Sequence, residues 1–172
     1  MIRKAAMKDI DGIEEIYNRV LDMEECGKAS IGWQRGVYPT RDTAVQALQR
    51  GDLFVYEDNG QLIASAIINH HQMDSYRLGH WRVEATENEV MVLHTLVVDP
   101  QFFGRGIGRE FVEYYEQYAK ENDCTDLRMD TQEKNHAARN LYHCLGYEEI
   151  GIVPCDFNGI KGISLVLLEK KL

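Results

Sequence analysis

The sequence predicts a single α+β domain over residues 1–172, in which a mixed sheet is flanked by helices. Three observations indicate this fold class. The 172 residues are enough for one domain, and a chain of this size buries roughly 70% of its unfolded surface. Segments with strand-like apolar patterns alternate with segments of helical period. A strand, a helix and a second strand follow one another between residues 90 and 131, which is typical of a parallel crossover.

Three strands and two helices are predicted in the first half of the chain. The strands are expected at residues 2–6, 53–57 and 62–69. Asn59 and Gly60 lie between the last two, and an Asn-Gly pair is typical of a tight hairpin turn. We expect Asp9 to cap the first helix, and Thr40 to cap a second helix that ends before Gly51.

The second half is predicted to hold the rest of the sheet. Residues 90–98 form a nearly continuous apolar run, the pattern of a strand that is covered on both faces. The elements expected after it are a helix at residues 107–122, a strand at 127–131 and a helix at 135–145. Two final strands, at residues 147–153 and 163–168, are expected to pair antiparallel around Asn158-Gly159.

The composition favours an acidic protein of the reducing cytoplasm. Nineteen Lys and Arg against 28 Asp and Glu give a formal net charge of −9, whereas a nucleic-acid scaffold usually shows a basic footprint. The four cysteines form no Cys-x-x-Cys pair, and the first ten residues lack the apolar core of a signal peptide. No apolar run approaches the ~18 residues of a membrane span. We therefore expect a cytoplasmic location, with no nucleic-acid or membrane partner.

A glycine-rich turn follows the apolar strand. Asp99-Pro100 ends the strand, because proline cannot donate to a sheet ladder. Gly104, Gly106 and Gly108 then leave the backbone bare at the start of the next helix, where free N–H groups and the helix dipole attract an anion. Neither the dinucleotide spacing G-x-G-x-x-G nor the P-loop pattern is present. The turn therefore predicts a binding site for a phosphate ester.

Two motifs taken together resemble those of a known family. Residues 96–108 read Leu-Val-Val-Asp-Pro-Gln-Phe-Phe-Gly-Arg-Gly-Ile-Gly and resemble the acetyl-CoA-binding motif of the GNAT superfamily of N-acetyltransferases. Residues 135–147 resemble the next motif of that family, N-x-x-A-x-x-L-Y-x-x-x-G-F/Y. The resemblance covers residues 90–150 by motif and the earlier half by element order. It implies a three-layer form of the predicted fold: a mostly antiparallel central sheet with a parallel, splayed central strand pair and flanking helices.

The resemblance implies acetyl-CoA as a co-substrate. Its pyrophosphate would lie on the N–H groups of residues 103–108, and its pantetheine arm would pair with the end of the apolar strand. The cofactor-binding residues are then expected to be Leu96, Val97, Val98, Phe103, Gly104, Arg105, Gly106, Ile107, Gly108, Arg109, Asn135 and Tyr142. The family usually has Gln or Arg at the position of Phe103, which leaves the side-chain contribution there open. Asn135 is also a natural helix N-cap, which explains its position equally well.

The implied reaction is transfer of an acetyl group to an amine by direct attack in a ternary complex. Tyr142 is expected to protonate the departing thiolate, and packing within its apolar helix face is the alternative role. The candidates for the general base are His94, with a reference pKa of about 6.5, and Glu89. Glu84 and a chain of waters are further alternatives. No cysteine has a recognisable arrangement of nucleophile and base.

The acceptor is expected to bind at the two segments that lack a period, residues 24–38 and 70–89. Its expected walls are Trp33, Arg35, Tyr38, Tyr76 and Trp81. The second segment is long for a connection, so it either carries a function or conceals an extra strand end. Histidines and cysteines show no metal-ligand spacing, so no metal is expected.

The expected acceptor is a primary amine of a small molecule, an amino-acid derivative or a peptide. Subunit number stays open, with a homodimer as one alternative. Two other functions also stay open: a CoA-binding regulatory module without turnover, and an acyltransferase that uses a longer acyl-CoA.

Overall fold

One seven-stranded sheet forms the centre of the computed structural model, which describes residues 1–172. The strands are β1 (Ile2–Lys4), β2 (Leu53–Asp58), β3 (Gln61–Asn69), β4 (Val90–Val98), β5 (Asp126–Gln132), β6 (Glu148–Phe157) and β7 (Ile160–Lys171). Their order across the sheet is β1-β2-β3-β4-β5-β7-β6. Every neighbouring pair is antiparallel except β4 and β5, which run parallel in the middle of the sheet. The predicted mixed, mostly antiparallel sheet is therefore confirmed.

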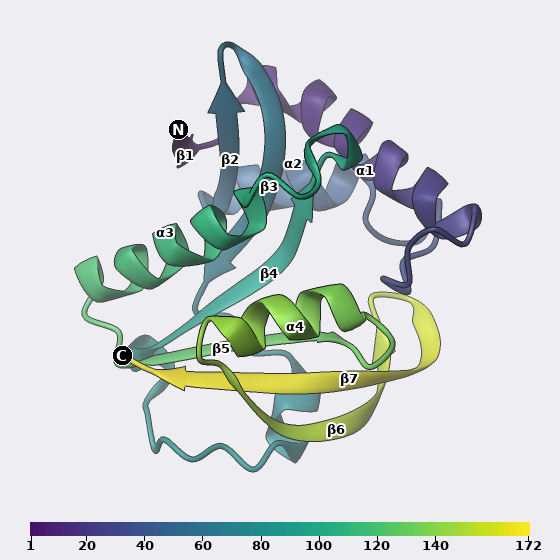
Figure 1. Cartoon of the computed structure of the whole chain (residues 1–172). Coiled ribbons are helices and arrows are strands. Elements are labelled where there is room, and N and C mark those ends of the chain that lie inside the picture. Colours follow the sequence, from purple (N-terminus) through teal and green to yellow (C-terminus); the bar gives the residue numbers. More distant parts are fainter.

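Four helices cover the two faces of the sheet and give the molecule three layers. The helices are α1 (Ile10–Glu25), α2 (Arg41–Arg50), α3 (Ile107–Glu121) and α4 (His136–Cys144). α3 and α4 lie on one face, and α1 and α2 lie on the other (Figure 1). Each buries an apolar stripe against the sheet, as the helical spacing of its apolar residues requires. None of them combines the length and the apolar character needed to cross a lipid bilayer.

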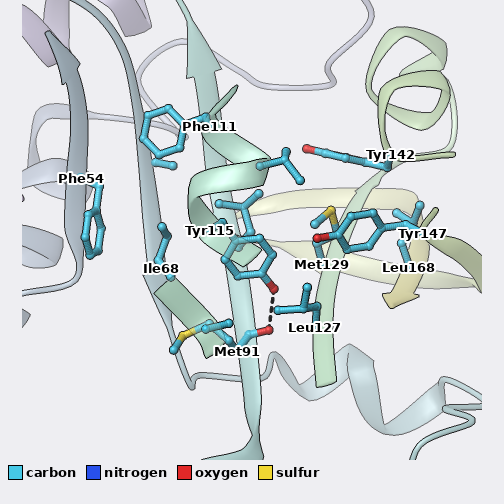
Figure 2. Close-up of a cluster of buried hydrophobic side chains, with 14 of the residues drawn as sticks. Phe54, Ile68, Met91, Phe111, Tyr115, Leu127, Met129, Tyr142, Tyr147 and Leu168 are labelled. Atoms are coloured by element: carbon cyan, nitrogen blue, oxygen red, sulfur yellow. Dashed lines mark hydrogen bonds between the residues drawn. The ribbon is translucent and has the colours of Figure 1, made fainter. Parts of the chain in front are cut away.

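Apolar side chains fill the spaces between the layers in separate clusters. The largest cluster joins Phe111 and Tyr115 of α3 to Met91 of β4 and Leu127 of β5 (Figure 2). The buried Tyr115 hydroxyl donates to the carbonyl oxygen of Met91 at 2.6 Å and lies 3.2 Å from that of Arg128. A second cluster packs α1 and α2 against β2, β3 and β4. Tyr115 thus ties α3 to both central strands where they lie side by side.

The central strands β4 and β5 separate after a short stretch of pairing. Residues 90–93 pair with residues 126–129, and beyond them β5 pairs only with β7. Thr95 has a φ of +51°, which is unusual for a β-branched residue. The register between β3 and β4 shifts beside it. Such a bulge bends its strand, and the edge of β4 that faces β5 is left without a partner strand. The predicted splay of the parallel pair is therefore confirmed.

The start of α1 differs from the prediction. The Asp9 carboxylate accepts hydrogen bonds from the backbone N–H of Ala6 at 2.7 Å and from the Arg3 guanidinium at 2.7 and 3.0 Å. It therefore stabilises a 3-10 turn (Met7–Asp9) that precedes α1. Asp9 occupies the predicted N-cap position of α1, but its side chain makes no capping hydrogen bond there, because its oxygens accept from Ala6 and Arg3.

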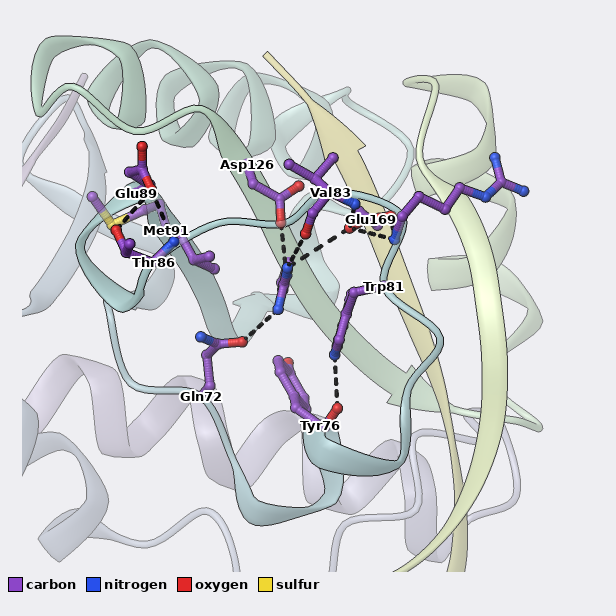
Figure 3. Close-up of polar contacts among 12 residues, drawn as sticks. Gln72, Tyr76, Trp81, Val83, Thr86, Glu89, Met91, Asp126 and Glu169 are labelled. Carbon is purple, nitrogen blue, oxygen red and sulfur yellow. Dashed lines mark hydrogen bonds and ion pairs between the residues drawn. The ribbon is translucent and has the colours of Figure 1, made fainter.

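The long connection at residues 70–89 contains no strand. It forms two 3-10 turns, Asp74–Leu78 and Glu87–Glu89, and it is fastened to the sheet by Arg128 of β5. Arg128 Nη1 donates to Gln72 Oε1 at 2.8 Å, and Nη2 donates to the carbonyl oxygen of Val83 at 3.0 Å (Figure 3). The connection is therefore an ordered segment, and Arg128 contacts it at two separate points.

The Arg128 guanidinium is buried, and each of its three nitrogens donates a hydrogen bond. Its Nε donates to Asp126 Oδ2 at 2.7 Å, and its plane lies 4.2 Å from the ring centre of Trp81. Glu169 of β7 lies 3.8 Å from Nη2 and accepts hydrogen bonds from the backbone N–H groups of Arg82 and Val83. A buried cation is tolerated only with such compensation.

Replacing Arg128 tests how far this cluster stabilises the fold. Arg128→Met keeps the apolar bulk but leaves the buried carboxylates of Asp126 and Glu169 without a cation. Loss of one partner from a buried ion pair costs about 3–5 kcal/mol, and we expect a loss of this size in urea-induced unfolding.

Arg35→Met is the matched control. Arg35 is an exposed cation that pairs with Asp22 and Glu25 of α1, so its loss should cost much less stability than the loss of Arg128. Equal losses of stability in the two variants would contradict the role given to Arg128.

Candidate active site

An apolar groove lies where β4 separates from β5, beside α3 and α4. It encloses about 480 Å³ and is bounded by the end of β4, the glycine turn, α4 and the loop after α1. Most of the residues expected to bind a cofactor line it: Leu96, Val97, Val98, Phe103, Gly104, Gly106, Ile107, Gly108, Asn135 and Tyr142. We call this cavity the glycine-turn groove.

The glycine turn is held in place by Asp99, which is fully buried. Asp99 Oδ2 accepts a hydrogen bond from Arg19 Nη1 of α1 at 2.6 Å, and Oδ1 accepts one from the backbone N–H of Gln101 at 3.0 Å. Gly104 and Gly106 have φ angles of +77° and +82°. A residue with a side chain would pay roughly 1–2 kcal/mol for that left-handed conformation. The turn therefore depends on glycine at these two positions.

The N–H groups of this turn have no partners within the chain. Those of residues 104–109 donate no hydrogen bond, whereas Phe103 donates to the carbonyl oxygen of Pro100 at 3.3 Å and Glu110 to that of Gly106 at 3.0 Å. The first turn of a helix leaves such groups free, and the positive end of the helix dipole lies at the same place. The turn can therefore hold an anion without a cationic side chain.

One wall of the groove is formed by the loop after α1. The Glu24 carboxylate accepts hydrogen bonds from the N–H groups of Ile31 at 2.6 Å and Gly32 at 3.0 Å, which folds the loop back towards β5. Gly32 has a φ of +82°, a conformation that favours glycine, and a Cβ there would also displace the Gln132 amide. The loop thereby brings Trp33 to the opening between the central strands.

A smaller cavity of about 80 Å³, the junction pocket, lies between the separated ends of β4 and β5. It shares Trp33, Leu96, Asn135 and Tyr142 with the glycine-turn groove, so the two cavities adjoin each other. Tyr142 extends from α4 towards β4 with its hydroxyl at the leading end (Figure 2). Burial raises the pKa of Tyr142 above its usual value, and the neighbouring Asp130 raises it further. The hydroxyl therefore stays protonated at neutral pH.

Asp130 of β5 lies in the same pocket, and the sequence did not single it out. Its Oδ2 accepts a hydrogen bond from the Tyr76 hydroxyl at 2.8 Å. Burial raises the pKa of Asp130 to about 6, although the bond from Tyr76 opposes that rise. At pH 7 the group is mostly a carboxylate that can accept a proton. One sequence signal was available: an acidic residue near the carboxyl end of a strand parallel to β4, where open sheets bind ligands.

A third cavity, the α2 pocket, encloses about 280 Å³ on the far side of Tyr38 and Thr95. The hydroxyl groups of these two side chains are hydrogen-bonded to each other, and both residues also line the junction pocket. His94 lies in the α2 pocket, whereas Tyr142 lies in the junction pocket. Burial lowers the pKa of His94 to about 4, so its imidazole is neutral at pH 7.

Two residues suggested as alternative bases lie away from these cavities. Glu89 accepts hydrogen bonds from the N–H and the hydroxyl of Thr86 at 2.8 and 2.7 Å (Figure 3). It stands at the start of β4, the opposite end from the glycine turn. Glu84 is exposed in the same connection. Glu89 lies where the sequence placed it, at the start of β4, and its carboxylate closes a local turn.

Three of the expected acceptor walls also lie elsewhere. Arg35 forms ion pairs with Asp22 and Glu25 of α1. Tyr76 is fully buried behind Asp130. Trp81 packs on Arg128, and its indole N–H donates to the carbonyl oxygen of Tyr76 at 2.7 Å. Trp33 and Tyr38, in contrast, line the junction pocket.

The cations near the glycine turn are arranged differently from the prediction. Arg105 lies over the ring of Phe102, 4.9 Å from its centre, and Arg109 lies 4.0 Å from Glu113 on α3. Neither lines the groove, whereas Lys28 does. Lys28 belongs to an irregular loop, and no local pattern in the sequence marks it.

Comparison with known proteins agrees with this geometry. Residues 13–147 match the family model of the acetyltransferase (GNAT) family, and the chain belongs to that family. The chain is 27% identical over 168 residues to MJ1207, an uncharacterised N-acetyltransferase of Methanocaldococcus jannaschii. That alignment covers 94% of this chain and 66% of MJ1207, so the chain spans just under two thirds of that relative's length.

Solved structures share the fold over the whole chain. A GNAT-family acetyltransferase from Streptococcus agalactiae is 25% identical with a TM-score of 0.81, and the match covers 100% of this chain and 95% of the other. YncA of Salmonella typhimurium, solved with its cofactor acetyl-CoA, is 19% identical with a TM-score of 0.71. That match covers 100% of this chain and 93% of YncA.

Tyr76→Phe tests the contact between the long connection and Asp130. The variant removes the hydrogen bond that lowers the pKa of Asp130 and leaves its burial unchanged. We expect the pKa of Asp130 to rise above its native value of about 6, as followed by NMR titration of its carboxyl carbon.

Tyr56→Phe is the control, because Tyr56 donates to a different carboxylate, that of Glu110, at 2.6 Å. It should leave the Asp130 titration unchanged. A fall in the pKa of Asp130 in Tyr76→Phe, or no change, would show that the hydroxyl does not stabilise the carboxylate.

Proposed function

We propose that the chain transfers an acetyl group from acetyl-CoA to a primary amine while both substrates are bound. One observation carries the proposal: a groove lined by free N–H groups adjoins a pocket that holds Tyr142 and Asp130. Membership of the acetyltransferase (GNAT) family and the acetyl-CoA named for YncA support the same assignment.

The donor fits the glycine-turn groove by its chemistry. The pyrophosphate would accept hydrogen bonds from the N–H groups of residues 104–109, with the Lys28 ammonium nearby. The pantetheine arm would follow the apolar wall of the groove. Its amides would pair with the backbone of Leu96 and Val98, whose strand edge has no partner on the β5 side. A backbone N–H of that edge would also stabilise the oxyanion of the tetrahedral intermediate.

The junction pocket supplies the proton transfers. The acceptor first loses its ammonium proton to water, the neutral amine nitrogen attacks the carbonyl carbon of the thioester to form the C–N bond, and the C–S bond then breaks. The second proton lost by the nitrogen passes to the Asp130 carboxylate, and the Tyr142 hydroxyl gives its proton to the departing sulfur. Asp130 takes the role that the sequence pattern suggested for Glu89. His94, a neutral imidazole in the adjoining pocket, is the alternative base.

The size and charge of the junction pocket favour a particular pair of substrates. A cavity of about 80 Å³ suits a two-carbon acyl group better than a longer one. Asp130 presents a negative charge to the arriving ammonium group of the acceptor. A primary amine of a small molecule, an amino-acid derivative or a peptide therefore remains the proposed acceptor.

A change at Gly106 tests the donor site. A Cβ at Gly106 would meet no atom of the chain within 4 Å, so Gly106→Ala fills only space on the ligand side and adds backbone strain. We expect acetyl-CoA to raise the Tm of the native chain and to bind Gly106→Ala at least tenfold more weakly in calorimetric titration.

Gly51→Ala is the matched control. Gly51 has a similar φ of +78° and equally open surroundings, but it follows α2 and lies away from the groove. This variant should lose similar stability and keep native affinity for acetyl-CoA. Native affinity in Gly106→Ala, or no Tm shift in the native chain, would contradict the proposed donor site.

Tyr142→Phe tests the proposed general acid. Thiol release from acetyl-CoA, measured with the best amine from a screen, should fall about 100-fold or more in kcat, because positioned proton transfer contributes about 10²–10⁴-fold. Affinity for acetyl-CoA should stay within a few fold of the native value. Tyr147→Phe is the control, since Tyr147 packs against Tyr142 at 6.0 Å between ring centres but lines none of the three cavities. Native turnover in Tyr142→Phe would remove the tyrosine from the reaction.

A further inference from the structure

The α2 pocket lies next to the proposed site of transfer and has a different character. It meets the junction pocket at three shared residues, Tyr38, Thr95 and Phe157. The glycine-turn groove adjoins the junction pocket at other residues, so the α2 pocket stands on the side that the donor leaves free. A ligand group in the α2 pocket would therefore belong to the acceptor.

A chain of hydrogen bonds fixes the orientation of Asn69 at the base of this pocket. Arg50 Nε lies 2.9 Å from Asp52 Oδ2, and Nη2 lies 3.3 Å from Oδ1. Asp52 Oδ2 also lies 2.8 Å from Asn69 Nδ2. A carboxylate accepts hydrogen bonds and donates none, so it must face the amide nitrogen of Asn69. The Asn69 oxygen is thereby turned the other way, towards His94.

The orientation of Asn69 in turn fixes the tautomer of His94. His94 Nε2 lies 3.1 Å from Asn69 Oδ1 and 3.0 Å from the carbonyl oxygen of His71. Both partners are acceptors, so Nε2 must carry the hydrogen. Because the ring is neutral at pH 7, Nδ1 then holds a lone pair. No group of the chain donates a hydrogen bond to Nδ1. Nδ1 is also not one of the polar side-chain atoms that are fully buried without a hydrogen-bond partner.

The charge of the pocket adds to this unused acceptor. Asp42, on the first turn of α2, lines the pocket and has no cation paired with it. The guanidinium of Arg50 is already paired with Asp52. His71, whose ring lies 6.4 Å from that of His94, completes this side. The pocket therefore offers a lone pair and a carboxylate to a positively charged hydrogen-bond donor.

We propose that the α2 pocket is a second subsite for the acceptor, and that it selects small amines with a second, protonated nitrogen. The reacting nitrogen would enter the junction pocket, while the second ammonium group would donate to His94 Nδ1 and face Asp42. The acceptor class is then a short diamine. This inference rests on the proposed function for the role of the first nitrogen, but the subsite itself is a matter of binding.

Matched acceptors test the selection. Acetyl transfer to 1,4-diaminobutane should exceed transfer to pentylamine, which replaces one ammonium by a methyl group, by tenfold or more in kcat/KM. A charge-assisted hydrogen bond is worth at least this factor. His94→Phe, which keeps the bulk and removes the lone pair, should reduce the ratio between the two amines to about twofold or less.

A second variant guards against a folding defect in His94→Phe. Asp42→Asn alters an exposed side chain of α2 and should also lower the diamine preference. Asp123→Asn, an equally exposed acid in the loop after α3, should leave the preference unchanged. A native ratio in both His94→Phe and Asp42→Asn would overturn the proposal.

NMR of the ¹⁵N-labelled histidine side chains separates this proposal from the proposed function. Native His94 should show a protonated Nε2 and an unprotonated Nδ1, and 1,4-diaminobutane should shift the Nδ1 resonance whereas pentylamine should not. A response to the diamine without transfer to any amine would support the subsite and refute acetyl transfer. Transfer without a diamine preference, with no response of Nδ1, would refute the subsite alone. A proton on Nδ1 in the free protein would also refute it.

Discussion

The separation of β4 from β5 is the constraint on which the other features depend. The two strands share four residue pairs, and the bulge at Thr95 then bends β4 away. Tyr115 and Arg128 stabilise the end at which the two strands are paired. The Tyr115 hydroxyl contacts a carbonyl oxygen of each strand, and the Arg128 guanidinium donates a hydrogen bond to the buried carboxylate of Asp126. The closed end is therefore rigidly held. All three cavities lie along the end that the bulge opens.

This separation also explains how an acidic chain can present an anion site. A net charge of −9 disfavours anions at long range, but such repulsion between exposed charges is screened beyond about 8 Å at physiological ionic strength. The free N–H groups of residues 104–109 act at hydrogen-bond distance, where the direction of each donor matters more than the net charge. Arg105 and Arg109 can therefore stand outside the groove without loss of the site.

Features encoded by neighbouring residues were predictable from the sequence, and features that join distant segments were not. Asp99-Pro100 and the glycines after it describe a turn and a helix start by themselves, so that short stretch is enough to predict the glycine turn. The importance of Asp130 depends on Tyr76, 54 positions away, and on a strand edge that only the assembled sheet exposes. The position of Glu89 depends on a local contact instead, since its carboxylate accepts a hydrogen bond from Thr86, three residues before it. A periodic pattern in the sequence does not reveal that a carboxylate already accepts hydrogen bonds from a neighbouring residue.

The hydrogen bond between Tyr38 and Thr95 lies at the boundary between two cavities. It stands between the junction pocket and the α2 pocket, while the glycine-turn groove joins the junction pocket at Trp33, Leu96, Asn135 and Tyr142. Because neither Tyr38 nor Thr95 lines the glycine-turn groove, a change at this hydrogen bond would alter the boundary with the α2 pocket and leave the boundary with the groove in place.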